Sequence, residues 1–138
     1  MQFRWVQGWH INGFGALFGG QILSWVDEDT NMLAYESSHQ GTHYTTGGYD
    51  RVSFLRPCYS GERLKFVYDI VHYGNRSVTI RSIITNSKGD KVFTCLTTMV
   101  RTVGDGLLSD VAEKVNKNAW PWNLVEQLRT ARRKEEPL

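Results

Sequence analysis

The sequence has little that would mark a membrane, secreted or nucleic-acid-binding protein. No apolar run approaches the roughly 18 residues of a membrane span. Its 16 basic and 14 acidic side chains leave a net charge of +2, so no strong positive field points to nucleic acid or an anionic membrane. The opening residues, MQFRWVQGWH, lack the basic segment, apolar core and cleavage site of a secretory signal. We therefore expect a cytoplasmic protein with neither nucleic acid nor membrane as a partner.

Cysteine is equally scarce, since Cys58 and Cys95 are the only two and form no CxxC motif. Two distant thiols predict neither a disulfide framework nor a zinc site. The four histidines do not have the HxxxH or HxH spacing of metal ligands; they are His10, His39, His43 and His72. The sequence also lacks a lysine-containing phosphate loop and a GxSxG nucleophile motif. These absences predict that the protein holds no metal and no cofactor of its own.

What the sequence does contain is enough apolar material for one folded domain. Hydrophobic residues make up 41% and charged residues 22% of 138 positions, which is typical of a globular chain with a real core. Neither glycine nor proline occurs between Gly20 and Gly41. Within that stretch Ile22, Val26 and Leu33 recur at helical spacing. The pattern predicts a long helix that ends near Gly41 as its C-cap.

Residues 44–103 show the patterns of four long strands. The segment ERLKFVYDIVHY alternates, which puts four apolar side chains on one face: Leu64, Phe66, Tyr68 and Ile70. Turn-like links such as HYGNRS and NSKGDK are short, and short links imply antiparallel neighbours. A further strand near QFRWVQ would add an edge. We predict an α+β fold in which a curved antiparallel sheet wraps around one long central helix.

The last 32 residues have a different character from the rest. We expect a main domain over 1–106 and a helical extension over 107–138, packed on the domain or on the oligomer. Two short helices are predicted there, with an apolar stripe and two packing tryptophans: Leu124, Leu128, Ala131, Trp120 and Trp122. The basic end, RTARRKEE, is interpreted as a solvated face.

Three consecutive acidic residues, Asp27, Glu28 and Asp29, lie within the predicted helix. Successive side chains on a helix point about 100° apart, so a helix wrapped by a sheet cannot expose all three. A buried carboxylate is costly unless it has partners or a function. An isolated aspartate on a helix is more often a surface group, so the neighbouring motifs have to decide between the two interpretations.

Three segments carry those motifs: INGFGALFGGQILSWVD at 11–27, TGGYDRVSFLRPCYSGE at 46–62 and SV at 77–78. Their distinctive residues are Asn12, Gly15, Phe18, Gly19, Gly20, Ser24, Asp27, Thr46, Asp50, Phe54, Leu55, Arg56, Pro57, Gly61, Glu62, Ser77 and Val78. In this order and spacing the segments resemble the hotdog-fold acyl-CoA thioesterases of the bacterial acyl-CoA hydrolase type. The resemblance extends over roughly residues 8–106 and agrees with the helix-and-sheet pattern.

The resemblance implies hydrolysis of an acyl-CoA thioester in lipid metabolism, with CoA as part of the substrate. It makes Asp27 the catalytic carboxylate, acting as general base on water or as nucleophile. It makes Asn12 the amide that positions water or the carbonyl, and the N–H of Gly19 or Gly20 the oxyanion donor. Physical chemistry supports these roles, because N–H groups at a helix start are oriented toward a developing negative charge. Glycine also lets a thioester approach the backbone closely.

Six further residues are candidates for contact with the substrate: Thr46, Asp50, Arg56, Arg76, Ser77 and Phe18. Thr46 would orient the attacking water or Asp27, although threonine in a strand is commonly a β-former without a function. Ser77 and Arg76 in a predicted hairpin would contact the pantetheine or phosphates of CoA, or they simply form the turn. Arg56 is a similar candidate for phosphate, and Phe18 for the acyl chain.

Gly20 and Asp27 are seven positions apart on one helix, so about 10 Å separates their backbones along the axis. A single carbonyl is therefore not expected to touch both residues of one chain. We expect a composite site with Asn12 and the Gly19–Gly20 turn from one subunit and Asp27 from its partner. Such a site needs a homo-oligomer, with a dimer as the minimal unit and a tetramer or hexamer as the expected assembly.

Two other functions are compatible with the predicted fold. A hydratase or dehydratase acting on 3-hydroxyacyl thioesters would need a histidine beside a carboxylate to move a proton at carbon. The helix start offers glycines there and no histidine. A non-catalytic acyl-CoA sensor would leave Asp27 incidental, but the sequence contains no DNA-reading segment to go with it.

Overall fold

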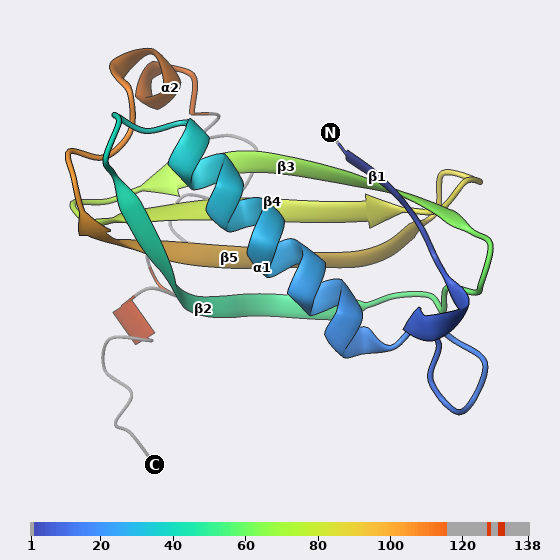
Figure 1. Ribbon diagram of the computed structural model, residues 1–138. Helices are drawn as coiled ribbons and strands as arrows, with labels where there is room; N and C mark the ends of the chain where they lie inside the picture. The colour runs from blue at the N-terminus through green and yellow to red at the C-terminus, as the bar shows by residue number, and fades with distance from the viewer. Residues whose placement is uncertain (1, 116–126, 128–129, 132–138) are drawn as a thin grey trace.

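A computed structural model describes residues 2–115, 127, 130 and 131. It consists of one five-stranded antiparallel sheet and one long helix that lies across the sheet (Figure 1). The predicted α+β architecture is confirmed, including the edge strand at the start of the chain. None of the helices among these residues is both long enough and apolar enough to cross a membrane.

The strands pair in the order β1-β3-β4-β5-β2, and every neighbouring pair is antiparallel. The helices and strands are β1 (Gln2–Trp5), the 3-10 turn η1 (Gly8–His10), α1 (Gly19–Glu36), β2 (His43–Phe54), β3 (Arg63–Tyr73), β4 (Ser77–Thr85), β5 (Lys91–Val103) and α2 (Ser109–Glu113). The sheet therefore ends with the short β1 on one side and the 12-residue β2 on the other.

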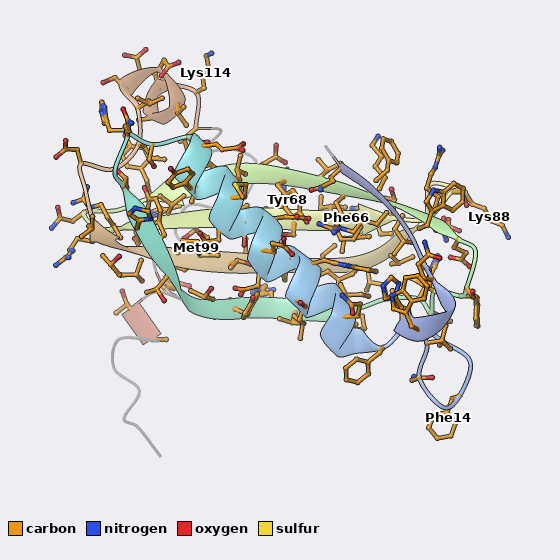
Figure 2. All side chains as sticks on the ribbon, in the orientation of Figure 1. Phe14, Phe66, Tyr68, Lys88, Met99 and Lys114 are labelled. Carbon is orange, nitrogen blue, oxygen red and sulfur yellow. The ribbon has the colours of Figure 1, made fainter. Side chains whose placement is uncertain are left out.

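The core lies between α1 and the face of the sheet that looks toward it. Ile22 and Val26 of α1 are buried in one cluster with Phe66 of β3 and Phe93 of β5. Figure 2 shows Phe66, Tyr68 and Met99 reaching from the sheet toward the helix. Burying such side chains contributes about 1.5–3 kcal/mol each. The predicted apolar face of β3 is confirmed by this packing.

The helix ends earlier than its sequence predicts. It stops at Glu36 and not near Gly41, which has φ +85° and lies in the following turn. Ser38 explains the difference, because its hydroxyl donates to the carbonyl of Ala34 at 2.7 Å and also bonds the Tyr44 hydroxyl. The Ala34 carbonyl is thus satisfied by a side chain, and the contact with Tyr44 takes the backbone out of the helix.

The sheet covers only part of the helix circumference. One stripe, repeating every four positions, is exposed: Gly20, Ser24, Glu28 and Met32. Of the three consecutive acids, Glu28 lies on this stripe, whereas Asp27 and Asp29 are half-buried and contact the sheet. The expectation that the three carboxylates cannot all face solvent is confirmed.

The C-terminal extension is described only at its beginning. Residues before α2 hydrogen-bond to the end of α1, with His39 N–H donating to the carbonyl of Gly106 and Leu108 N–H to that of Ser37. The predicted boundary between 106 and 107 stays a prediction. The second tail helix was predicted from Leu124, Leu128, Trp120 and Trp122, which lie outside the described residues. Of the basic end, Thr130 and Ala131 are described, and Ala131 is exposed.

Candidate active site

The helix α1 begins at two glycines, and its first N–H groups are open. The N-cap residue, Phe18, provides no side-chain hydrogen bond, and the N–H groups of Gly19 and Gly20 find no acceptor among the described residues. A Cβ added to Gly20 would lie 2.5 Å from the Phe18 ring, and one added to Gly19 would lie 3.1 Å from the Phe54 ring. Free N–H groups at a helix start form a preoriented site for a negatively charged oxygen.

Asp27 lies two turns further along α1 and is held by two hydroxyl groups from β2. The Tyr49 hydroxyl donates to Asp27 Oδ1 at 2.8 Å, and the Thr46 hydroxyl donates to the same oxygen. Asp27 Oδ2 has no partner within the part of the chain that the structure describes. Burial, together with the hydrogen bond and charge of Asp27, raises the pKa of Tyr49, so its hydroxyl stays a donor.

A β-bulge lets β2 deliver both hydroxyls to one carboxylate. Residues 46 and 49 would point to opposite faces of a regular strand. The pairing with β5 shifts register between Thr46 and Gly48, and this extra residue brings Tyr49 to the helix-facing side. Gly47 permits the bulge, because a Cβ there would lie 2.7 Å from Val100 Cγ2 and 3.2 Å from the Thr98 carbonyl oxygen.

Asn12 closes the loop that precedes α1. Its Oδ1 accepts the backbone N–H groups of Phe14 at 2.8 Å and Ala16 at 3.2 Å. Its own N–H donates to the Ala16 carbonyl at 2.7 Å, so the loop is fastened at both ends. Phe14 lies at the tip of this loop, 97% exposed (Figure 2). The Asn12 side-chain NH₂ has no acceptor in the described chain and remains available as a donor.

Asp29 is the second half-buried carboxylate of α1, and both of its oxygens are occupied. Arg4 of β1 donates to Oδ1 at 2.5 Å, and the Tyr68 hydroxyl of β3 donates to Oδ2 at 2.5 Å. Burial raises the pKa of Tyr68, and the hydrogen bond to Asp29 acts in the same direction. With one donor on each oxygen, Asp29 serves as an anchor between helix and sheet.

Ser77 and Arg76 lie away from Asp27, at the hairpin between β3 and β4. They line a groove of about 200 Å³ that Arg101 and Tyr44 also border. The Ser77 hydroxyl is buried there and has no hydrogen-bond partner among the residues that the structure describes. Across the sheet, Thr46 pairs with Met99 and Met99 with Val78, the residue after Ser77. The groove is therefore about two strand spacings, or roughly 10 Å, from Asp27 and its two hydroxyl donors.

The other sequence candidates are dispersed. Asp50 follows Tyr49 directly, so its side chain points to the opposite face of the sheet from Asp27. Arg56 is exposed and approaches Asp90 at 4.0 Å. Phe18 is 59% exposed beside the helix start. The structure thus gathers Asp27 with Thr46, and the two glycines with Phe18, but it does not bring Asp50 or Arg56 to either group.

Tyr49 is the residue that sequence reasoning missed. Regular alternation along a strand would put Tyr49 and Thr46 on opposite faces, so the strand pattern alone does not bring the two together. The signal was present in the double glycine of TGGYD, because glycine inside a strand pattern often marks a bulge. A bulge at that point predicts that Thr46 and Tyr49 share a face.

Comparisons with known proteins support the same fold. The family model of the thioesterase superfamily matches residues 14–93. A search of curated proteins finds no match to the chain. Among solved structures, an acyl-CoA hydrolase from Staphylococcus aureus, in complex with butyryl coenzyme A, coenzyme A and coenzyme A disulfide, is 25% identical. The alignment covers 96% of this chain and 84% of that one, with a TM-score of 0.76.

Two further structures are hexameric thioesterases. The one from Yersinia pestis is 25% identical over 78% of this chain and 93% of its own, with a TM-score of 0.69. The hotdog-fold enzyme of Campylobacter jejuni is 23% identical over 83% of this chain and 93% of its own, also with a TM-score of 0.69. Since the family model spans more than half of the sequence and the antiparallel sheet packs against one long helix, this chain belongs to the thioesterase superfamily and has the hotdog fold.

Proposed function

We propose that this protein is an acyl-CoA thioesterase, which hydrolyses the thioester of acyl-CoA to free CoA and a carboxylic acid. The observation that carries the proposal is the Asp27 carboxylate, which is clamped through Oδ1 and leaves Oδ2 without a partner among the described residues. The open N–H groups of Gly19 and Gly20 supply the second requirement of thioester hydrolysis.

In the proposed reaction Asp27 Oδ2 removes a proton from water, and the water oxygen bonds to the thioester carbon. The carbonyl oxygen then carries a negative charge, which a glycine N–H at the helix start stabilises. The Asn12 side-chain NH₂ donates to the carbonyl or holds the water. Collapse of the tetrahedral intermediate breaks the C–S bond, and the proton passes to the CoA sulfur. No cofactor besides the CoA of the substrate takes part.

The CoA portion is assigned to the hairpin groove. Arg76 and Arg101 bring two guanidinium groups to its rim, and each uses one nitrogen to bond a backbone carbonyl, at 3.4 and 3.3 Å. Their remaining donors are suited to phosphate oxygens. The buried Ser77 hydroxyl offers a polar contact inside the groove. Arg56 and Asp50 are secondary candidates, because they lie away from both the groove and Asp27.

The proposed active site is shared between two subunits. Gly20 and Asp27 stand about 10 Å apart along α1, so the oxyanion donor for one Asp27 comes from another chain. β2, which carries Thr46 and Tyr49, ends the described sheet, and its outer edge pairs with no described strand. An open edge of 12 residues is a template for pairing with a second copy. Dimers of this kind are the expected building block of a tetramer or hexamer.

A panel of acyl-CoA substrates with a colorimetric thiol reagent tests the function. We expect thiol release by the wild-type protein and loss of that release in Asp27→Asn, which keeps the shape of the side chain without its charge. Saturable binding of acyl-CoA without thiol release would indicate a sensor. A change of enoyl absorbance without thiol release would indicate a hydratase, and either result would refute the proposal.

Purified heterodimers test the sharing of the site. One chain carries Asp27→Ala and the other Asn12→Ala, each with its own affinity tag. A shared site leaves one of the two sites intact, so the heterodimer should regain about half of the wild-type activity while each homodimer stays inactive. A site within one chain leaves none intact, and an inactive heterodimer of proven composition would contradict sharing.

A further inference from the structure

We propose that Tyr49 is a positioning residue, which together with Thr46 fixes Asp27 Oδ1 and so dedicates Oδ2 to the reaction. This inference rests on the proposed thioesterase function and extends it to a residue that is not among the distinctive residues of the motifs that indicate that function. It concerns how the carboxylate is presented and not which ligand binds.

The geometry at Asp27 supports a fixed orientation of the carboxylate. A carboxylate rotates about its Cβ–Cγ bond unless hydrogen bonds hold it, and its terminal torsion has broad minima. The Tyr49 hydroxyl at 2.8 Å and the Thr46 hydroxyl meet the same oxygen, so both constrain the same torsion. Tyr49 also packs against the main core cluster, which restricts the movement of its ring.

The local backbone is shaped to place Tyr49 there. Gly47 and Gly48 interrupt a strand, where glycine costs conformational entropy and offers no side chain to pack. Gly47, where a Cβ would clash with Val100, permits the bulge that brings Tyr49 onto the helix-facing side. Without the bulge, the regular alternation of β2 would give Asp27 a single hydroxyl partner from this strand. The bulge therefore has one structural effect at the site: it gives Asp27 Oδ1 a second hydrogen bond.

Asp29 shows what a purely structural carboxylate looks like in the same helix. Its two oxygens are taken by different donors, Arg4 on Oδ1 and Tyr68 on Oδ2. At Asp27 both donors share one oxygen. Tyr49 and Tyr68 are thus chemically matched, each giving one hydroxyl to a half-buried aspartate of α1. They differ in whether a second oxygen is left for substrate or water.

The matched pair defines the experiment: Tyr49→Phe is compared with Tyr68→Phe in the intact oligomer. For the acyl-CoA that the wild type hydrolyses fastest, we expect Tyr49→Phe to lower kcat roughly 10- to 100-fold, because the carboxylate is no longer held in its reactive orientation. KM should stay within about twofold, since the hydroxyl does not touch the substrate. Tyr68→Phe should leave kcat within about twofold of wild type.

A second measurement does not depend on activity. In protein labelled with ¹³C-aspartate, the side-chain Cγ resonance of Asp27 is identified from its loss in Asp27→Asn. We expect the chemical shift of this resonance to change in Tyr49→Phe and to stay unchanged in Tyr68→Phe. The Asp29 resonance should change in Tyr68→Phe and stay unchanged in Tyr49→Phe. Urea denaturation shows whether the two variants fold equally, so that a fall in kcat is not a loss of folded protein.

The outcomes separate the two proposals. An unchanged kcat in Tyr49→Phe overturns the positioning role while leaving the thioesterase function standing. If the Asp27 resonance does not shift in Tyr49→Phe, the Tyr49 hydroxyl does not hold Asp27 Oδ1. That result also overturns the inference. A wild-type protein that hydrolyses no acyl-CoA overturns the proposed function and the positioning role with it, although the resonance still reports whether Tyr49 binds Asp27.

Discussion

Asp27 and Asp29 stand two positions apart on α1, and tyrosine hydroxyls hold them from different parts of the sheet. Tyr49 reaches Asp27 from β2 at one end of the strand order, and Tyr68 reaches Asp29 from β3 near the other end. Both bonds tie α1 to the sheet, but only the bond from Tyr49 holds the carboxylate that keeps one oxygen without a partner among the described residues.

The first prediction separates the two carboxylates by stability. Asp29→Asn removes the charge that Arg4 and Tyr68 both contact, and it leaves the half-buried Arg4 without its counter-charge. We expect the free energy of unfolding to fall by about 2–3 kcal/mol. Asp27→Asn, whose oxygen can still accept hydroxyl protons, should lower it by less than about 1 kcal/mol. Urea denaturation followed by tryptophan fluorescence measures both values, and equal losses would contradict the distinction.

The second prediction concerns the helix start. In Gly20→Ala the new methyl group meets the exposed ring of Phe18, which can swing away, so the variant should fold with a stability within about 1 kcal/mol of wild type. The same methyl group keeps the thioester from the N–H donors, and kcat/KM should fall roughly 10- to 100-fold. Steady-state kinetics against an acyl-CoA measures this.

Gly8→Ala is the matched control for Gly20→Ala, because a Cβ at Gly8 meets nothing within 4 Å and lies outside the site. It should keep the wild-type kcat/KM. If Gly20→Ala is as active as this control, the backbone N–H groups at the start of α1 are not the oxyanion donors.

The third prediction is that the protein's own thiols do not interfere with a thiol-release assay. Both Cys58 and Cys95 are buried, and burial raises the pKa of the Cys58 thiol to about 11. At pH 8 only about one Cys58 thiol in a thousand is then ionised. The folded protein without substrate should show no reaction with the reagent over minutes. Unfolding in guanidinium should release the two thiols together, and rapid reaction of the folded protein would contradict their burial.

The fourth prediction is a loss of stability in alkaline solution. Burial and the negative charge of Glu62 raise the pKa of Cys58 from 9.0 to about 11, so the unfolded chain loses this proton at a lower pH than the folded chain. Between those values the folded state binds more protons, and the free energy of unfolding must fall as the pH rises, by up to about 2 kcal/mol. Tyr49 and Tyr68, whose pKa values are also raised, act in the same direction above pH 10.

Guanidinium denaturation at several values between pH 8 and pH 10.5 measures that slope. Cys58→Ala is the appropriate comparison, because it removes one of the groups whose titration causes the loss. Its slope between pH 9 and pH 10 should be shallower than that of wild type, even though the variant begins less stable. Parallel slopes would show that Cys58 does not titrate as described.

The strands could be predicted because each is a local pattern that the fold does not override. Leu64 and Phe66 alternate with polar neighbours, and the packing confirms that they share the helix-facing side of β3. The end of α1 could not be predicted in the same way. Ser38 ends the helix through contacts with Ala34 and Tyr44, and the Tyr44 contact brings together residues that no helical pattern links.

The candidate site was recovered only in part, for a related reason. Motif spacing singled out Asp27, Asn12 and the glycine pair, and the structure places Thr46 on Asp27. Tyr49 was missed because a bulge changes which side chains share a face, and a one-residue insertion has little effect on composition. The motif predicts Asp50 at the site, yet its neighbour Tyr49 is the residue that faces α1.

By itself the sequence determined where the four long strands lie along the chain, the long helix and the presence of an acid within it, because these follow from periodicity along the chain. Only the tertiary structure decided how Asp27 and Asp29 differ. Both are aspartates in one helix with similar neighbours in sequence, and what distinguishes them is which strand lies beneath each. Whether the donors meet one carboxylate oxygen, as at Asp27, or both, as at Asp29, depends on distances between segments that are separated along the chain. No local sequence pattern encodes those distances.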